Sequence, residues 1–110
     1  MREDVLKGRT KRIQTGCGWM YITLNGGGTG VVEVFARLGK AGGCALSQTE
    51  ALGRVISLAL RYGVPIEELR EQLQGIRCNA PKGDVLSCAD AVAKGLVARP
   101  NLKEKEDVEA

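Results

Sequence analysis

Polar and apolar residues alternate along the first third of the chain with the period of two that is typical of β-strands. Residues 19–24 place Met20, Ile22 and Leu24 on one face and Trp19, Tyr21 and Thr23 on the other. Residues 31–38 predict a partner strand, whose apolar face would carry Val32, Val34, Ala36 and Leu38. The segment between them, NGGGTG, lacks the Gly-Lys-Ser/Thr ending of a phosphate-binding loop and predicts a hairpin connection.

A further strand is predicted over residues 10–15, where Ile13 is the only large apolar residue. The polar residues before it are typical of a mobile arm, and the Lys- and Glu-rich C-terminal residues are typical of a disordered tail. We therefore expect a mobile arm at residues 1–9, one domain at residues 10–99 and a charged tail at residues 100–110.

The strongest helical pattern follows the strands. Ser47 and Glu50 have the spacing of a capping box, which predicts that the helix begins at Ser47. Its apolar stripe recurs at intervals of three and four residues and comprises Leu52, Val55, Ile56, Ala59 and Leu60. Gly63 and Pro65 are expected to end this helix.

Two shorter helices are predicted in the last third of the chain. Residues 66–74 begin after Pro65, bury Ile66, Leu69 and Leu73, and end at Gly75. Residues 88–98 begin after Ser87, which has Asp90 three positions later, and bury Ala91, Val92 and Leu96. The order of elements predicts an α+β fold, in which a small antiparallel sheet of two or three strands is followed by three helices packed on one face.

Composition excludes several classes of active site. The 110 residues contain no histidine, so no Ser-His-Asp or Cys-His unit can form, and the chain is not expected to catalyse a reaction on its own. The formal net charge of +3 does not by itself indicate a nucleic-acid partner. No signal peptide and no membrane span are expected, so we predict a cytoplasmic protein in which the 4 cysteines are thiols or metal ligands.

The cysteines lie near the ends of the predicted elements. Cys17 precedes a strand, Cys44 precedes the long helix, Cys78 lies in a loop and Cys88 opens the last helix. Positions at helix N-termini are expected to lower thiol pKa values and so to favour thiolate ligands. No pair has the two-residue gap of a zinc knuckle, so the spacing leaves open a shared metal site, unligated thiols and redox-active thiols.

Three segments resemble the TSCPD domain, which is known as a C-terminal module of adenosylcobalamin-dependent (vitamin B12-dependent) ribonucleotide reductases and as a free-standing protein. They are GKAGGCALSQTEALGRVISLAL, GIRC and VLSCADAVAKGL. The family's Ser-Cys-Pro-Asp reads Ser87-Cys88-Ala89-Asp90 here, so Cys and Asp are kept and the proline is replaced. The resemblance implies a metal site, with zinc expected, formed by Cys17, Cys44, Cys78 and Cys88. Their sulfurs are expected to cluster within about 4 Å of one another.

The order of cysteines and elements is also similar, more distantly, to iron–sulfur cluster scaffold proteins of the NifU/IscU type. On that mapping Cys17, Cys44 and Cys88 match the three scaffold cysteines. The function implied by the first resemblance is a non-catalytic metal-binding accessory domain associated with ribonucleotide reductase and deoxynucleotide metabolism. An iron–sulfur cluster or metal carrier and a thiol redox protein are the alternatives.

A second candidate site is the polar face of residues 19–24. Trp19 and Tyr21 point away from the predicted core and lie near Arg12 and Arg37, which predicts an interaction surface. A protein partner, a homodimer and a stacked nucleic-acid base are the alternatives for this surface.

Overall fold

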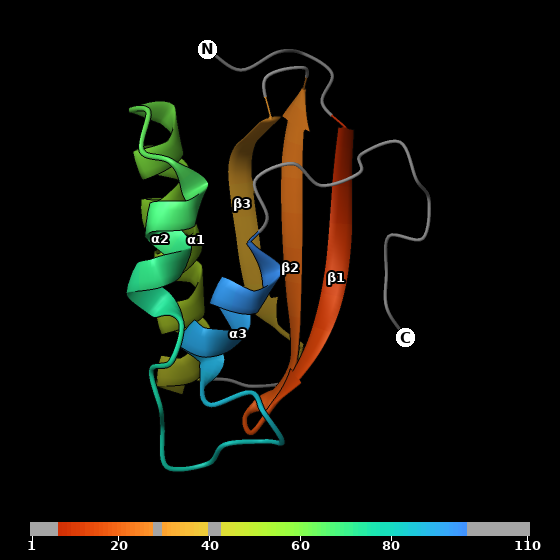
Figure 1. Ribbon diagram of the computed structural model, residues 1–110. Helices are drawn as coiled ribbons and strands as arrows, with labels where there is room; N and C mark the ends of the chain where they lie inside the picture. Colours follow the sequence, from red (N-terminus) through yellow and green to blue (C-terminus); the bar gives the residue numbers. More distant parts are fainter. Residues whose placement is uncertain (1–6, 28–29, 40–42, 97–110) are drawn as a thin grey trace.

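The computed structural model describes residues 7–27, 30–39 and 43–96. Three strands come first: β1 (Lys7–Thr15), β2 (Gly18–Gly27) and β3 (Gly30–Leu38). Three helices follow: α1 (Gly43–Arg61), α2 (Ile66–Leu73) and α3 (Cys88–Gly95). The strands form one antiparallel sheet in the order β1-β2-β3, and the helices lie toward one side of it (Figure 1). The predicted α+β fold is confirmed.

The core forms between the helices and the sheet face that carries Met20, Ile22 and Leu24, as the alternation predicts. β3 adds Val34, Ala36 and Leu38 to the same face, and Ile56, Ile66, Ala91, Val92 and Leu96 cover it from the helices. Because each of these side chains is at least nine-tenths buried, their burial supplies the main favourable term in folding.

Two strand predictions need correction. β1 begins at Lys7, inside the predicted arm, because its pairing with β2 continues as far as Lys7 opposite Gly26. In β3, Val31 packs against the core and Val32 is exposed, because a bulge shifts the register between Asn25 and Gly26. Such a bulge adds a residue to one strand and so reverses the alternation beyond it.

The predicted start of α1 is wrong. The helix begins at Gly43, and the Ser47 hydroxyl donates to the Cys44 carbonyl instead of capping the first turn. Glu50 pairs with Arg54. The buried side of α1 extends back to Ala45 and Thr49, so packing against the sheet outweighs the local capping signal. Val55, predicted to be buried, is 61% exposed.

The other helices agree more closely with the predictions. α2 follows Pro65 and ends one residue before the predicted end, and Gly63, just beyond α1, has the positive φ expected of it. The Ser87 hydroxyl caps α3 by accepting from the Asp90 N–H at 3.0 Å. α3 ends at Gly95, before the predicted end at residue 98. Residues 1–6 of the predicted arm and the whole predicted tail at residues 100–110 lie outside the described residues.

Helix α1 covers the outer edge of β3. Its Ser57 hydroxyl accepts from the Val34 N–H at 2.9 Å and donates to the Val34 carbonyl at 3.0 Å. Gly53, one turn earlier, faces the strand backbone, and a β-carbon there would lie 3.3 Å from the Ala36 nitrogen. The helix therefore approaches close enough to satisfy backbone groups that an edge strand would otherwise leave to water.

We expect Ser57→Ala to destabilise the domain by about 1–2 kcal/mol, because both backbone groups of Val34 lose their partner at a half-buried site. The measurement is urea unfolding followed by circular dichroism. Ser47→Ala is the matched control, since its hydroxyl contacts only an exposed carbonyl of its own helix. Equal stability of the two variants would show that α1 does not depend on this edge contact.

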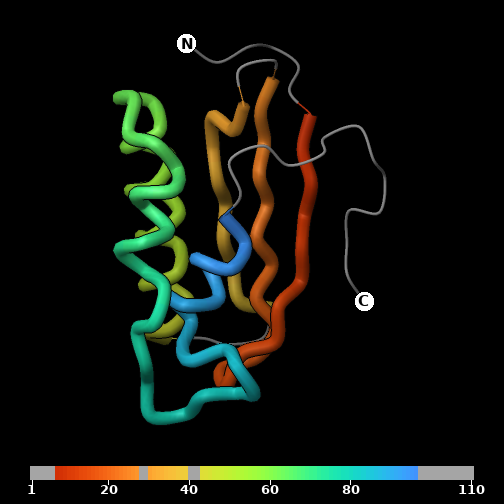
Figure 2. The backbone as a smooth tube through the Cα atoms, in the orientation of Figure 1, coloured from red at the N-terminus to blue at the C-terminus, as the bar shows by residue number. Residues whose placement is uncertain are grey.

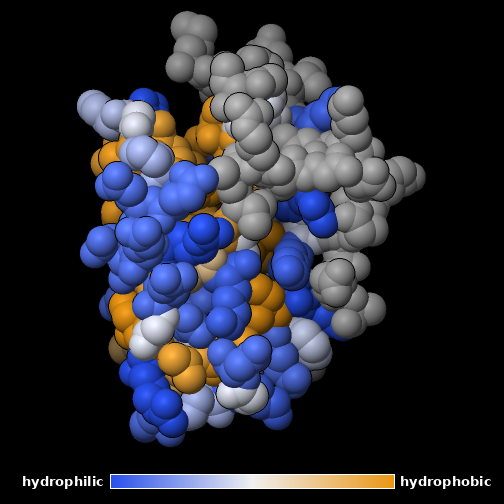
Figure 3. All heavy atoms as spheres, in the orientation of Figure 1, coloured by the Kyte–Doolittle hydropathy of each residue, from blue (hydrophilic) through white to orange (hydrophobic). Residues whose placement is uncertain are grey.

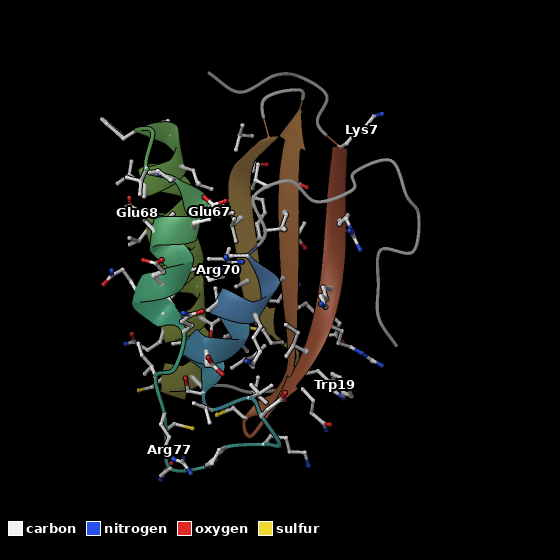
Figure 4. The ribbon with its side chains drawn as sticks, in the orientation of Figure 1. Lys7, Trp19, Glu67, Glu68, Arg70 and Arg77 are labelled. Carbon is white, nitrogen blue, oxygen red and sulfur yellow. The ribbon has the colours of Figure 1, made fainter. Side chains whose placement is uncertain are left out.

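The face that carries α2 is mainly hydrophilic, with small separate apolar areas (Figure 3). Arg70 on this helix points toward α3 and donates to the Leu96 carbonyl at 3.3 Å (Figure 4). Among the described residues, no helix is both long and apolar enough to cross a membrane.

Candidate metal centre

The four segments that carry the cysteines lie at the same end of the domain (Figure 2). They are the β1–β2 turn, the first turn of α1, the loop between α2 and α3, and the first residue of α3. Antiparallel pairing brings the β1–β2 turn to this end, and α1 and α3 begin here. The fold thus gathers sulfur atoms from across the sequence at one end of the molecule.

Thr15 organises the turn that carries Cys17. Its buried hydroxyl accepts from the Cys17 N–H at 3.0 Å and donates to the Gly18 carbonyl at 2.8 Å. The same oxygen lies 4.0 Å from the Cys88 sulfur. Thr15 was predicted only as the end of a strand, yet it joins the Cys17 turn to the start of α3. In the sequence, a hydroxyl residue two positions before a cysteine in a tight turn could have indicated this role.

Gly16 lets the Cys17 turn meet the loop between α2 and α3. A β-carbon at residue 16 would collide with the Ala80 carbonyl, so no larger residue fits while that contact is kept. Glycine at position 16 thus permits a close backbone approach beside Cys17. The contact brings the Cys17 turn against the loop that contains Cys78.

Asp90 and Ser87 fasten that loop to α3. The Asp90 carboxylate is 2% exposed and accepts from the N–H groups of Gly75 at 2.8 Å and Leu86 at 3.0 Å. The Ser87 hydroxyl donates to the Ile76 carbonyl, and the Cys78 N–H donates to the Leu86 carbonyl at 3.0 Å. Both ends of the loop are thereby fixed, which positions Cys78 relative to Cys88.

The pKa of the Cys88 thiol depends on its burial and on two other thiols. Burial raises the pKa of the Cys88 thiol, and the neighbouring Cys17 and Cys78 raise it further, while a hydrogen bond with Thr15 acts in the opposite direction. The expectation that the helix N-terminus would lower this pKa is therefore wrong for Cys88. Desolvation is the largest cause of the rise, and the interaction with the neighbouring thiols adds to it.

Cys44 is placed differently from the other three. It is exposed in the first turn of α1, inside the helix and not before it. Cys17 is also exposed, whereas Cys78 and Cys88 are partly buried. The expected cluster of four sulfurs within about 4 Å is not formed. In the part of the chain that the structure describes, no three Cys, Asp or Glu side chains are close enough to form a metal-binding group.

The chemistry of the cysteine side chains nevertheless suits a cation that prefers sulfur ligands. Zinc prefers thiolate ligands, and a divalent cation between Cys17, Cys78 and Cys88 would offset the mutual repulsion that raises the pKa of Cys88. The Ala80 N–H, 3.3 Å from the Cys78 sulfur, is a donor of the kind that orients a metal-bound thiolate. A fourth ligand would have to come from the exposed Cys44 or from outside the chain.

The predicted interaction residues also come together. Tyr21 is paired across the strands with Arg12 on one side and Arg37 on the other. The Arg12 guanidinium lies over the Trp19 ring, 4.0 Å from its centroid. Figure 4 shows Trp19 on the far side of β1 from α1 and α2. Phe35, which is 57% exposed and lies two residues from Arg37 on the same face of β3, was not predicted as part of this surface.

A family model described as the TSCPD domain matches residues 2–99 of the chain. No match was found among curated proteins or among solved structures. The similarity to iron–sulfur scaffold proteins stays a prediction.

Proposed function

Since the chain belongs to the TSCPD domain family, we propose that it is a zinc-binding accessory domain that works with a ribonucleotide reductase in deoxynucleotide metabolism and is not itself catalytic. The observation that supports the metal site is the arrangement of Cys17, Cys78 and Cys88. Three thiols from three separate segments lie at one end of the domain, held there by Thr15 and Asp90.

In this proposal the zinc ligands are Cys17, Cys78 and Cys88, with Cys44 as the fourth. Bound zinc would supply positive charge and cross-link the β1–β2 turn to α3 and its preceding loop. The protein's own contribution is to bring the segments that carry these cysteines to one end of the domain and to keep Cys88 partly away from water. The exposed positions of Cys17 and Cys44 leave the site accessible from solvent, where a partner protein could also contact it.

A thiol redox role is the second candidate, because the Thr15 hydroxyl contacts both the Cys17 N–H and, at 4.0 Å, the Cys88 sulfur, which makes the two cysteines neighbours. Two thiols that form a disulfide release two protons and two electrons to a partner. The raised pKa of Cys88 counts against this role, since reactive cysteines usually have lowered pKa values that increase the thiolate fraction. An iron–sulfur carrier needs the same ligands and is distinguished by its absorption spectrum.

Elemental analysis of protein purified without oxygen tests the metal site. We expect about one zinc per chain, as in a structural site of four thiolates. Cys17→Ser and Cys88→Ser are each expected to lose the zinc, and Ser47→Ala, close to Cys44, is the matched control that keeps it. Metal-free protein with a rapidly forming Cys17–Cys88 disulfide would instead support the redox role.

The accessory role needs a separate measurement. Zinc-loaded protein is expected to bind a cobalamin-dependent ribonucleotide reductase from the same cells, and Cys88→Ser protein is expected to bind it more weakly. If the protein binds the reductase equally well with and without zinc, the metal site is not needed for this interaction. No binding in either form would contradict the association with the reductase.

A further inference from the structure

The sheet face opposite the core forms an aromatic platform. We use this name for Trp19, Tyr21 and Phe35. Trp19 and Tyr21 are two residues apart on β2, so they lie on one face, and Phe35 is paired with Thr23, the next outward residue of β2. The buried residues of β2 and β3 all belong to the other face, which the helices cover. Among the described elements, no helix covers the platform (Figure 1).

Basic side chains surround the platform. Arg12 and Arg37 flank Tyr21 on the two neighbouring strands. Beyond Phe35, a groove of about 850 Å³ lies between β3 and α1, and Arg37, Arg54 and Arg61 are among its lining residues. The acidic groups here are Glu33, which accepts from the Asn25 amide, and Glu50, which pairs with Arg54. Arginines therefore outnumber acidic residues on the surface that extends from Trp19 to the groove.

Arg12 occupies the position that a stacked ligand would need. Its guanidinium lies over Trp19, and its Nε–H is buried without a hydrogen-bond partner. An unsatisfied buried donor is costly. A flat ring that replaced the guanidinium on Trp19 would keep the stacking contact, and the displaced Arg12 could then pair with an anion through its Nε–H and terminal N–H groups.

These features suit one class of ligand. Flat rings joined by a negatively charged backbone, as in single-stranded nucleic acid, match aromatic side chains on a strand face with arginines between them. A second copy of this chain is disfavoured, because a symmetric contact would place this basic face against the same basic face of the other copy. From this complementarity we propose that the aromatic platform and the adjoining groove bind single-stranded nucleic acid.

The platform shares no residue with the proposed zinc ligands. It uses the outward face of β2 and β3, whereas Cys88 opens α3 on the core side of the sheet; Trp19, two residues after Cys17, is the platform residue nearest to the cysteines in sequence. Binding of an oligonucleotide is therefore expected to persist in Cys88→Ser protein. This separates failure of the platform from failure of the zinc proposal.

The test titrates the full-length protein with single-stranded oligonucleotides of twelve thymidines or twelve uridines at about 50 mM salt, where phosphate contacts are strong. Trp19 is the one tryptophan of the chain, so its fluorescence reports directly on stacking. We expect saturable quenching, with the two oligonucleotides showing whether DNA or RNA is preferred. A duplex of the same length is expected to bind more weakly.

Phe35→Ala is expected to weaken binding about tenfold, within the range measured for loss of one stacking partner. Phe35 is exposed, so this variant is expected to remain folded. Tyr62→Ala is the matched control, because Tyr62 is 79% exposed at the end of α1, outside the platform, and its loss is expected to leave affinity unchanged. Arg37→Gln is expected to reduce the slope of log affinity against log salt by about one.

Three results would overturn the proposal. One is the absence of quenching by either oligonucleotide. Another is equal affinity of Phe35→Ala and Tyr62→Ala, which would show that only general charge attraction is at work. The third is a concentration-dependent dimer in sedimentation analysis that Phe35→Ala abolishes while no oligonucleotide binds, which would assign this face to a second copy of the chain.

Discussion

Asp90→Asn is expected to destabilise the domain by about 2–4 kcal/mol, because an amide has one acceptor oxygen and one donor group at a position that is 2% exposed. The part-buried backbone N–H of Gly75 or Leu86 would then face the amide N–H groups and lose its acceptor. For a domain of this size the melting temperature should fall by about 10 °C or more. The loop between α2 and α3 would then lose its attachment, so zinc affinity should fall as well. The measurement is thermal unfolding followed by circular dichroism.

Asp84→Asn is the matched control, since Asp84 is an exposed carboxylate in the same loop. It is expected to leave the melting temperature nearly unchanged. If Asp90→Asn were as stable as this control, the two backbone hydrogen bonds of Asp90 would not hold the loop.

Asp90 also makes the stability of the folded domain depend on pH. Burial acts to raise the pKa of Asp90, but the N–H groups of Gly75 and Leu86 and the nearby Lys94 outweigh it, so the pKa lies below its ordinary value. The folded state therefore binds fewer protons than the unfolded state near the ordinary pKa of about 4. The stabilisation by Asp90 is complete above that pH and is lost as the pH falls through the lowered value. Asp90→Asn should flatten the stability curve in this acidic range.

Zinc is expected to stabilise the protein by about 2.7 kcal/mol when its free concentration is a hundred times the dissociation constant. That corresponds to a rise of about 10 °C or more in melting temperature. The effect should be local, because Cys88 is the one proposed ligand that packs against the apolar core between the helices and β2. Hydrogen exchange should therefore slow in the β1–β2 turn and in the loop between α2 and α3, and change little in the middle of β2.

Magnesium is the control ion, because it prefers oxygen ligands and should give no thermal shift. Cys88→Ser should abolish the shift with zinc. A shift of equal size in Cys88→Ser protein would mean that zinc binds elsewhere on the chain.

The sequence predicted the parts of the fold that follow from a repeating pattern. The alternation in β2, the two short helices and the Ser87 cap all depend on local chemistry that is visible in a few neighbouring residues. The start of α1 was missed because a local capping signal at Ser47 competes with burial of Ala45, which depends on a sheet elsewhere in the chain. The bulge before Val32 was missed because register depends on two strands at once.

The same distinction applies to the candidate site. Cysteines at the ends of elements could be found from the sequence, and the fold brings the segments that carry them to one end of the domain. The raised pKa of Cys88 could not be predicted from the sequence, because it depends on burial and on thiols that are distant in sequence. The roles of Thr15 and Asp90 were missed for the same reason, since their partners are set by tertiary structure.

The charged residues of β1 have a consequence for solubility. Helix α1 closes the edge of β3, whereas among the described strands none pairs with the outer edge of β1. Arg9 and Lys11 lie opposite Leu24 and Ile22, on the core side of this strand, where a flat sheet of a fibril would need apolar side chains. Inward-pointing charges of this kind discourage a second molecule from extending the sheet. The open edge is thus protected from edge-to-edge aggregation, and that protection should weaken as salt screens the charges.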